Sequence, residues 1–283
     1  MKLLTIFLIA ALNISTCFAQ TRADTLKAAD IISKSENAYA HLKTYADSGK
    51  LIQTMVINGM ASKTALIFKT AYNNTGGFNF EYYTVGKSNS LYTINRTDNV
   101  VKTWWGITNQ ESTPKSISNA IAAAAGVSSS TSTIIPELLM PNDFKMRNCF
   151  QLLKTYTLAG IEPVNGKACF KIKGDGAFGI TAIWVGKKDF LIMKIETEKV
   201  IDPAKVEANS LKIAQHMEKK DSVRYKEVIK ANKMIADINK RDSLRGAPRG
   251  SFTVKDTYVF VPVTNHKINP ELLKYRPKRE VSL

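Results

Sequence analysis

The chain has 283 residues, enough for one large or two small domains with a core of their own. It carries 40 lysines and arginines against 24 aspartates and glutamates, a formal net charge of +16. So basic a surface can attract anionic lipids, polyanions or nucleic acid, or can belong to a merely soluble cationic protein. None of its three histidines has a cysteine, histidine or carboxylate at metal-ligand spacing, which excludes a recognisable zinc site.

The first 19 residues have the three parts of a secretory signal peptide. Lys2 supplies a basic start, residues 3–12 are almost entirely apolar, and Cys17 and Ala19 place small residues at the −3 and −1 positions of a cleavage site. The apolar run is shorter than the roughly 20 residues that a membrane-spanning helix needs. We therefore expect residues 1–19 to be removed and residues 20–283 to form a single domain in the periplasm.

Cys17 also permits a second interpretation. The residues before it faintly resemble the site at which bacterial lipoproteins are acylated, which would attach the protein to the outer membrane. Thr16 suits the position before that cysteine poorly, so cleavage after Ala19 is the preferred prediction. In either case export makes nucleic acid the least expected of the anionic partners.

Two kinds of apolar pattern follow the signal peptide. Apolar residues recur every three or four positions from Leu26 to Leu42, which predicts a helix that ends before a turn signal at residues 47–49. From residue 51 the pattern alternates, with aromatic residues such as Phe78 and Phe80 in short segments separated by Asn, Gly and Ser. Such segments predict an antiparallel sheet and not a sheet of alternating parallel strands and helices.

Residues 116–140 have a different composition, which interrupts the strands. The alanine-rich run before Gly126 favours a helix, for which Gly126 is a suitable C-terminal cap. Because this helix has almost no charge, we expect it to be covered on most sides, as a helical lid that lies against the sheet. The serines at 128–130 lack the Gly-x-Ser-x-Gly pattern of a nucleophile, and we interpret them as a flexible hinge.

The second half of the chain returns to strand patterns and then departs from them. A hairpin turn is expected at Asn165 and Gly166, and strands are expected at residues 152–158, 168–172, 180–185, 190–195 and 252–261. Residues 203–245 carry apolar residues at roughly helical spacing among many charges, which predicts a charged helical insertion before the last strand. Its ordinary interpretation is a solvated helix; the alternative is docking on an anionic membrane surface or an envelope protein.

Only Cys149 and Cys169 remain in the chain after the signal peptide. An oxidising compartment favours a disulfide between them. A hairpin that closes near Asn165 and Gly166 would, however, put the two cysteines out of register. Both outcomes stay open.

Neither glycine-rich segment has the pattern of a ligand loop. Residues 160–167 resemble a phosphate loop, but five residues separate the glycines and Ala168 stands where a serine or threonine must hold magnesium. Residues 174–179 contain a single carboxylate, which is too few for calcium. The sequence therefore predicts no catalytic residue, no metal and no cofactor, and a protein that is not an enzyme.

Eight large apolar residues lie in or beside the expected lid and the strands that it would cover. They can form plain core. In a strongly curved sheet they can instead line a concave apolar cavity, the usual form of a site for a lipid or another small molecule. These candidate ligand-binding residues are Trp104, Trp105, Ile117, Ile121, Leu138, Leu139, Phe178 and Trp184.

Several motifs carry a family resemblance: YADSG at 45–49, FNFEY at 78–82, AIAAAAGVSS at 120–129, NGKACFKI at 165–172, IWV at 183–185 and FLI at 190–192. Together they resemble a predicted periplasmic family of unknown function that is similar to the LolA/LolB-like lipoprotein carriers. The resemblance implies an α+β fold, an unclosed antiparallel β half-barrel whose concave face is filled by helices, with a hydrophobic cavity for acyl chains. The charged helical insertion departs from the compact carriers.

Two hypotheses about function result. The first is a non-enzymatic periplasmic binding or carrier protein for a lipid or another hydrophobic ligand, which enters and leaves when the lid moves. The alternative is an envelope interaction or sensor module, in which the basic helix binds a protein partner or an anionic membrane surface. Charge reversal at Lys219, Lys220 and Arg224 would abolish binding only under the alternative.

Overall fold

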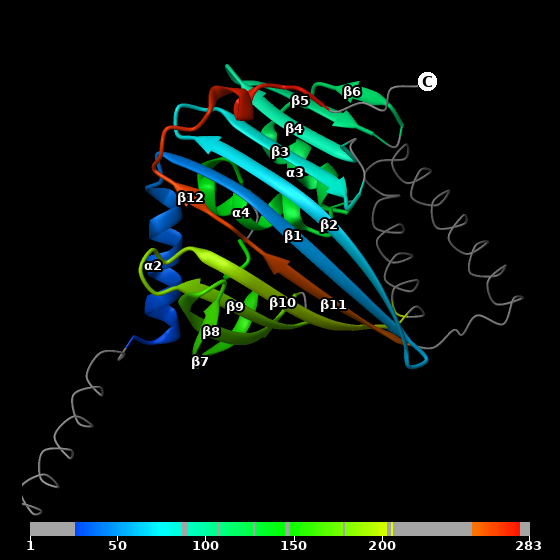
Figure 1. The fold of residues 1–283 in the computed structure, drawn as a ribbon, viewed down its shortest axis with the longest axis vertical. Helices are drawn as coiled ribbons and strands as arrows, with labels where there is room; N and C mark the ends of the chain where they lie inside the picture. The colour runs from blue at the N-terminus through cyan, green and yellow to red at the C-terminus, as the bar shows by residue number, and fades with distance from the viewer. Residues whose placement is uncertain are drawn as a thin grey trace, which may run out of the picture.

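The computed structural model describes residues 26–86, 90–106, 108–126, 128–144, 148–177, 179–202, 205 and 251–277. The predicted signal peptide with Cys17, residue Phe178, and the charged insertion at 203–245 apart from Lys205 lie outside the described residues. Figure 1 shows one large twisted sheet with helices packed against one of its faces.

In the described residues, twelve strands form this sheet, and every pairing between neighbours is antiparallel. Their order is β6-β5-β4-β3-β2-β1-β11-β10-β9-β8-β7, with β12 also paired to β1, so β6 and β7 are free edges and the sheet is open. The predicted α+β fold with an unclosed antiparallel sheet is confirmed. The strands are β1 (Thr44–Ile57), β2 (Met60–Asn73), β3 (Phe78–Thr84), β4 (Tyr92–Thr97), β5 (Val100–Trp105), β6 (Gln110–Ser112), β7 (Leu153–Val164), β8 (Lys167–Gly176), β9 (Gly179–Gly186), β10 (Ile192–Ile201), β11 (Phe252–Val259) and β12 (Val263–Thr264).

The predicted turn at residues 47–49 is wrong, because these residues lie inside β1. Gly49 faces Phe68 on β2, and a Cβ atom at Gly49 would lie 2.1 Å from Phe68 Cζ. The glycine therefore marks the close approach of an aromatic ring and not a turn. The turn of this hairpin is formed by Asn58 and Gly59, whose φ angles of 49° and 77° suit a two-residue connection between twisted strands.

Three helices cover one face of the sheet. The predicted first helix is α2 (Ala28–Ala40), and the lid (residues 116–140) contains two helices, α3 (Ile117–Ala125) and α4 (Thr131–Leu139), where one was predicted; the short 3-10 helix η1 (Pro141–Asp143) follows. In Figure 1, α3 and α4 lie behind β1–β4. Side chains from the helices and from this face of the sheet form the larger hydrophobic cluster.

A C-terminal segment (residues 265–277), which contains the 3-10 helix η2 (Pro270–Leu273), crosses the other face of the sheet. Asn95 Nδ2 on β4 donates a hydrogen bond to the carbonyl oxygen of Leu273 over 2.7 Å. Tyr275 Oη donates to the carbonyl oxygen of Thr103 on β5 over 3.2 Å. Residues 265–277 are therefore held against strands that lie far earlier in the chain, with Tyr275 and Thr103 separated by 172 positions.

Cys149 and Cys169 are both buried and both free. Cys149 belongs to the cluster under the helices, whereas Cys169 belongs to a second, smaller cluster with Val164, Trp184 and Met193. The two thiols belong to separate buried clusters, so Cys149 and Cys169 do not form a disulfide in this structure.

Candidate functional site

Five of the eight predicted ligand-binding residues meet on the helix-covered face. Ile117 and Ile121 on α3 and Leu138 and Leu139 on α4 are at most 3% exposed, and Trp105 on β5 packs against the same cluster. The ring of Trp105 meets that of Tyr92 edge-on, with the ring centroids 5.6 Å apart. The lid and the sheet are thus in direct apolar contact.

The other three residues do not join this group. Successive side chains of a strand point to opposite faces, so Trp104 cannot share the face of Trp105. Trp184 pairs with Lys171 and Lys194 and lies in the smaller cluster, where its indole Nε1 donates to Glu162 Oε2 over 2.9 Å. Phe178 lies outside the described residues.

The lid begins with a capped helix. Ser116 is the N-cap of α3, and its Oγ accepts a hydrogen bond from the backbone N–H of Asn119 over 3.2 Å. At the other end Gly126 has right-handed angles, φ −65° and ψ −43°, so it is not the left-handed cap that the sequence suggests. The left-handed positions fall instead on Ser129 and Ser130, with φ 46° and 64°.

The loop between α3 and α4 is packed and hydrogen-bonded. Ser128 and Ser132 are fully buried, and the Ser128 hydroxyl donates to Ser132 Oγ over 3.1 Å. Ser132 Oγ donates in turn to the carbonyl oxygen of Ile121, and Tyr258 Oη on β11 donates to that of Ser129 over 2.8 Å. Such contacts do not fit the flexible hinge that the sequence predicts at residues 128–130. The hydrogen bonds of this loop instead connect α3 and α4 as one unit.

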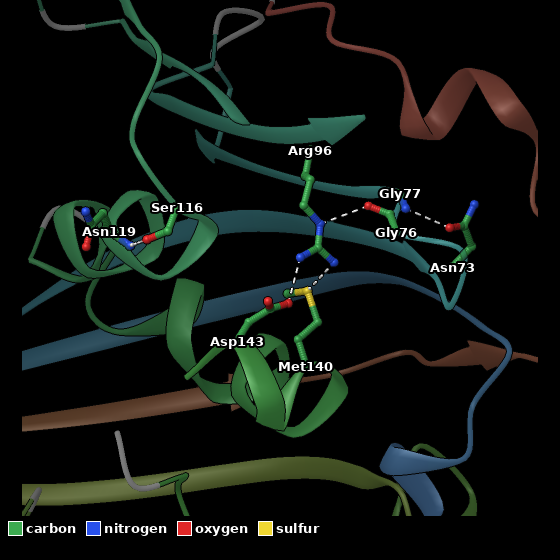
Figure 2. Close-up of polar contacts among 8 residues, drawn as sticks. All are labelled: Asn73, Gly76, Gly77, Arg96, Ser116, Asn119, Met140 and Asp143. Atoms are coloured by element: carbon green, nitrogen blue, oxygen red, sulfur yellow. Dashed lines mark hydrogen bonds and ion pairs between the residues drawn. The ribbon is translucent and has the colours of Figure 1, made fainter. Parts of the chain in front are cut away.

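Arg96 on β4 fixes the end of the lid to the sheet, as Figure 2 shows. Its Nη1 donates to Asp143 Oδ2 over 2.6 Å, its Nη2 lies 3.2 Å from the Met140 sulfur, and its Nε donates to the carbonyl oxygen of Gly76 over 2.8 Å. Asn73 holds the same turn, because its Oδ1 accepts from the N–H of Gly77 over 2.7 Å. The guanidinium group, with its side chain 13% exposed, therefore joins η1, β4 and the β2–β3 turn.

Glu137 is the one ionisable residue between residues 117 and 139. The residue is 6% exposed. Burial raises the pKa of its carboxyl group to about 7, so the group is protonated in a large share of molecules at neutral pH. Trp105 Nε1 is a buried N–H group without a partner among the described residues.

A second buried carboxyl group lies on β1. Asp47 accepts hydrogen bonds from Tyr45 Oη over 3.2 Å and from the backbone N–H of Val261 over 2.8 Å. Burial raises the pKa of Asp47 to about 6, although these hydrogen bonds partly oppose the shift. Tyr39 on α2 packs against Tyr45, and its hydroxyl accepts from the N–H of Ile192 over 3.1 Å. This group therefore joins α2, β1 and the chain after β11.

Sequence reasoning missed Arg96, Asp47 and Glu137, because each acts through contacts between residues far apart in the chain. In the described residues no group of three or more His, Cys, Asp or Glu side chains is arranged to hold a metal ion. None of the helices in the same part of the chain combines the length and apolar character that crossing a membrane requires.

The described residues thus form an open antiparallel sheet, and the nearly uncharged helices α3 and α4 cover its apolar face. No protein-family model and no curated protein matches the chain. Among solved structures it is similar to a DUF1329 family protein from Desulfovibrio piger (9% identity, 87% of this chain and 95% of that chain, TM-score 0.32). It is also similar to a LolA superfamily protein from Nitrosomonas europaea (8% identity, 88% and 98%, TM-score 0.29) and to lipoprotein LppX from Mycobacterium tuberculosis (10%, 84% and 95%, TM-score 0.30).

Proposed function

We propose that the protein binds a lipid or another hydrophobic ligand between its lid and its sheet, as a periplasmic carrier without catalysis of its own. The observation that carries the proposal is the lid itself. Its two helices have one ionisable residue, Glu137, and cover the apolar face of a sheet whose edge strands are β6 and β7. Burial of a hydrocarbon chain contributes about 0.8 kcal/mol per methylene, so affinity needs no polar catalyst.

Two polar groups on this side support a ligand with a polar end. The indole N–H of Trp105 is buried without a partner in the described residues, and the carboxyl group of Glu137, a residue that is 6% exposed, lies in the lid. Buried polar groups in folded proteins are nearly always hydrogen-bonded, so orphaned ones favour the binding of polar ligand atoms. A protonated Glu137 can donate to a ligand oxygen, and the carboxylate form can accept from a hydroxyl or amine.

Ligand entry requires the lid to move, because its inward side chains are buried against the sheet. Arg96 is the polar connection at the end of the lid, and the hydrogen-bonded 128–132 loop keeps α3 and α4 together. We expect the helical pair to swing as a unit after the contacts of Arg96 with Asp143 and Met140 and the hydrogen bond from Tyr258 to Ser129 break. Arg96→Gln should therefore accelerate ligand exchange without changing the apolar contacts.

Native mass spectrometry of protein purified from its own envelope tests the proposal. The expected result is a co-purified lipid, identified after solvent extraction, that exchanges faster with added lipid in Arg96→Gln than in the wild type. Lys63→Gln, at an exposed position on β2, is the matched control and should exchange at the wild-type rate. Protein that is ligand-free and takes up no lipid in either form would favour the envelope interaction module instead.

A further inference from the structure

A cavity of about 600 Å³ lies between β1–β3 and the C-terminal segment; we call it the outer cavity. It opens on the face of the sheet that the helices do not cover, because Ala46 and Ser48 alternate along β1 with the buried side chains of Tyr45 and Asp47. Its floor consists of the small side chains of Ala46, Ser48 and Ala71, which leave room that larger residues would fill. Its volume is that of a typical small-molecule site, about 300–1,000 Å³.

Apolar side chains surround the floor and remain open to solvent. Val261 and Val263 are each 52% exposed and Leu272 is 47% exposed, and all three line the outer cavity. Large apolar residues that gather in this way around a concavity indicate a ligand site more strongly than scattered ones. The interior therefore suits a hydrocarbon chain.

The charged groups at the outer cavity come from two elements. Lys69 and Glu81 face each other across β2 and β3, where their charges balance. On the C-terminal segment, Glu271 forms ion pairs with both Lys274 and Arg276, the latter at 2.6 Å. The hydrogen bond from Lys274 lowers the pKa of Glu271, which keeps that carboxyl group ionised.

The group of Glu271, Lys274 and Arg276 keeps one positive charge, because two cations share one carboxylate. The side chains of Lys274 and Arg276 are 51% and 66% exposed, and a guanidinium group has five N–H donors. Both cations therefore have donors left for an incoming anion, and charge-assisted hydrogen bonds to a carboxylate are among the strong ones in proteins.

We propose that the outer cavity binds a fatty acid, with the hydrocarbon chain over Ala46, Ser48 and Ala71 and the carboxylate at Lys274 and Arg276. This site is separate from the one between the lid and the sheet, because the sheet itself lies between them. The C-terminal segment supplies both cations and Leu272 to this site.

Calorimetric titration of the full chain with palmitate, below its micelle concentration, tests the site. Lys274→Gln together with Arg276→Gln removes both cations and should weaken binding by at least about tenfold, since the loss of one charge-assisted hydrogen bond alone has that effect. Ser48→Leu places a large side chain in the cavity from an exposed position and should abolish binding there. Lys63→Gln is the control for loss of a positive charge on β2 and should bind as the wild type does.

Several results would overturn the proposal. One is unchanged palmitate affinity in Ser48→Leu protein that unfolds at the wild-type temperature; Ala71→Leu repeats this test if Ser48→Leu does not fold. Equal affinity for hexadecanol and palmitate would remove the role of the two cations, and acetate that binds as tightly as palmitate would remove the role of the chain. Arg96→Gln acts only on the lid, so an effect of that variant on palmitate affinity would assign the binding to the lid side.

Discussion

Replacement of Asp47 by Asn should remove the fall in the free energy of unfolding that Asp47 causes between about pH 4 and 6. In the folded protein the pKa of Asp47 is raised to about 6 from its ordinary value of 3.8, mainly by burial. Between these two values the folded state holds a proton that the unfolded state has released, so the free energy of unfolding falls as the pH rises from about 4 to 6. One pKa unit corresponds to 1.36 kcal/mol, so the full loss is about 3 kcal/mol.

Asparagine at position 47 keeps an oxygen that accepts from the N–H of Val261 but cannot ionise. Urea unfolding followed by tryptophan fluorescence at pH 4, 5, 6 and 7 should therefore show the wild type losing about 3 kcal/mol relative to Asp47→Asn over this range. Asp98→Asn, in the exposed β4–β5 turn, makes the same chemical change away from the core and is the control. A difference between wild type and Asp47→Asn that stays constant, or that grows in favour of the wild type as the pH rises, would refute the reasoning.

Three further predictions concern packing, the lid and the thiols. Gly49→Ala should lower the free energy of unfolding by about 1–3 kcal/mol in a denaturant titration, because its Cβ would overlap the Phe68 ring. Gly126→Ala is the control. Gly126 has right-handed angles and no atom within 4 Å of an added Cβ, so this variant should be neutral or stabilising in the same titration. Glu137→Gln should remove a loss that the wild type undergoes between pH 4.5 and 7, because the raised pKa favours the protonated folded state. The loss should be about 1–2 kcal/mol, less than the pKa difference alone gives, because solvent screens a carboxyl group that is not completely buried. A difference in free energy of unfolding between wild type and Glu137→Gln that stays constant across this window would contradict the prediction. Burial raises the pKa of both cysteine thiols, so Cys149 and Cys169 should react with a disulfide reagent only after unfolding, and rapid labelling of native protein would argue against their burial.

The sequence predicted the type of fold well because its signals are local. Alternating aromatic residues such as Phe78 and Phe80 placed the strands, and the Asn165–Gly166 turn was correct, with φ angles of 49° and 75°. The first helix and the helical lid were also found from periodicity and composition. The error at residues 47–49 has a physical cause, since a glycine needed beneath a cross-strand ring has the same local pattern as a glycine in a turn.

The candidate site was less predictable because its contacts join distant residues. Arg96 and Asp143 are 47 positions apart, and nothing in either local pattern indicates their partner. Trp104 and Trp105 looked equivalent in the sequence, and only the strand register separates them onto opposite faces. The outer cavity depends on a C-terminal segment whose position the sequence left open.

The strand order has a consequence for how the chain folds as it is made. Strands β1–β6 and β7–β11 form the two halves of the sheet, and the pairing of β1 with β11 joins them, for example at Lys50 and Val259. Contacts between residues so far apart in sequence form late, because a long loop must close before they stabilise anything. The halves therefore cannot unite until residues 252–259 have emerged, so the two parts of the sheet stay separate in the nascent chain up to that point.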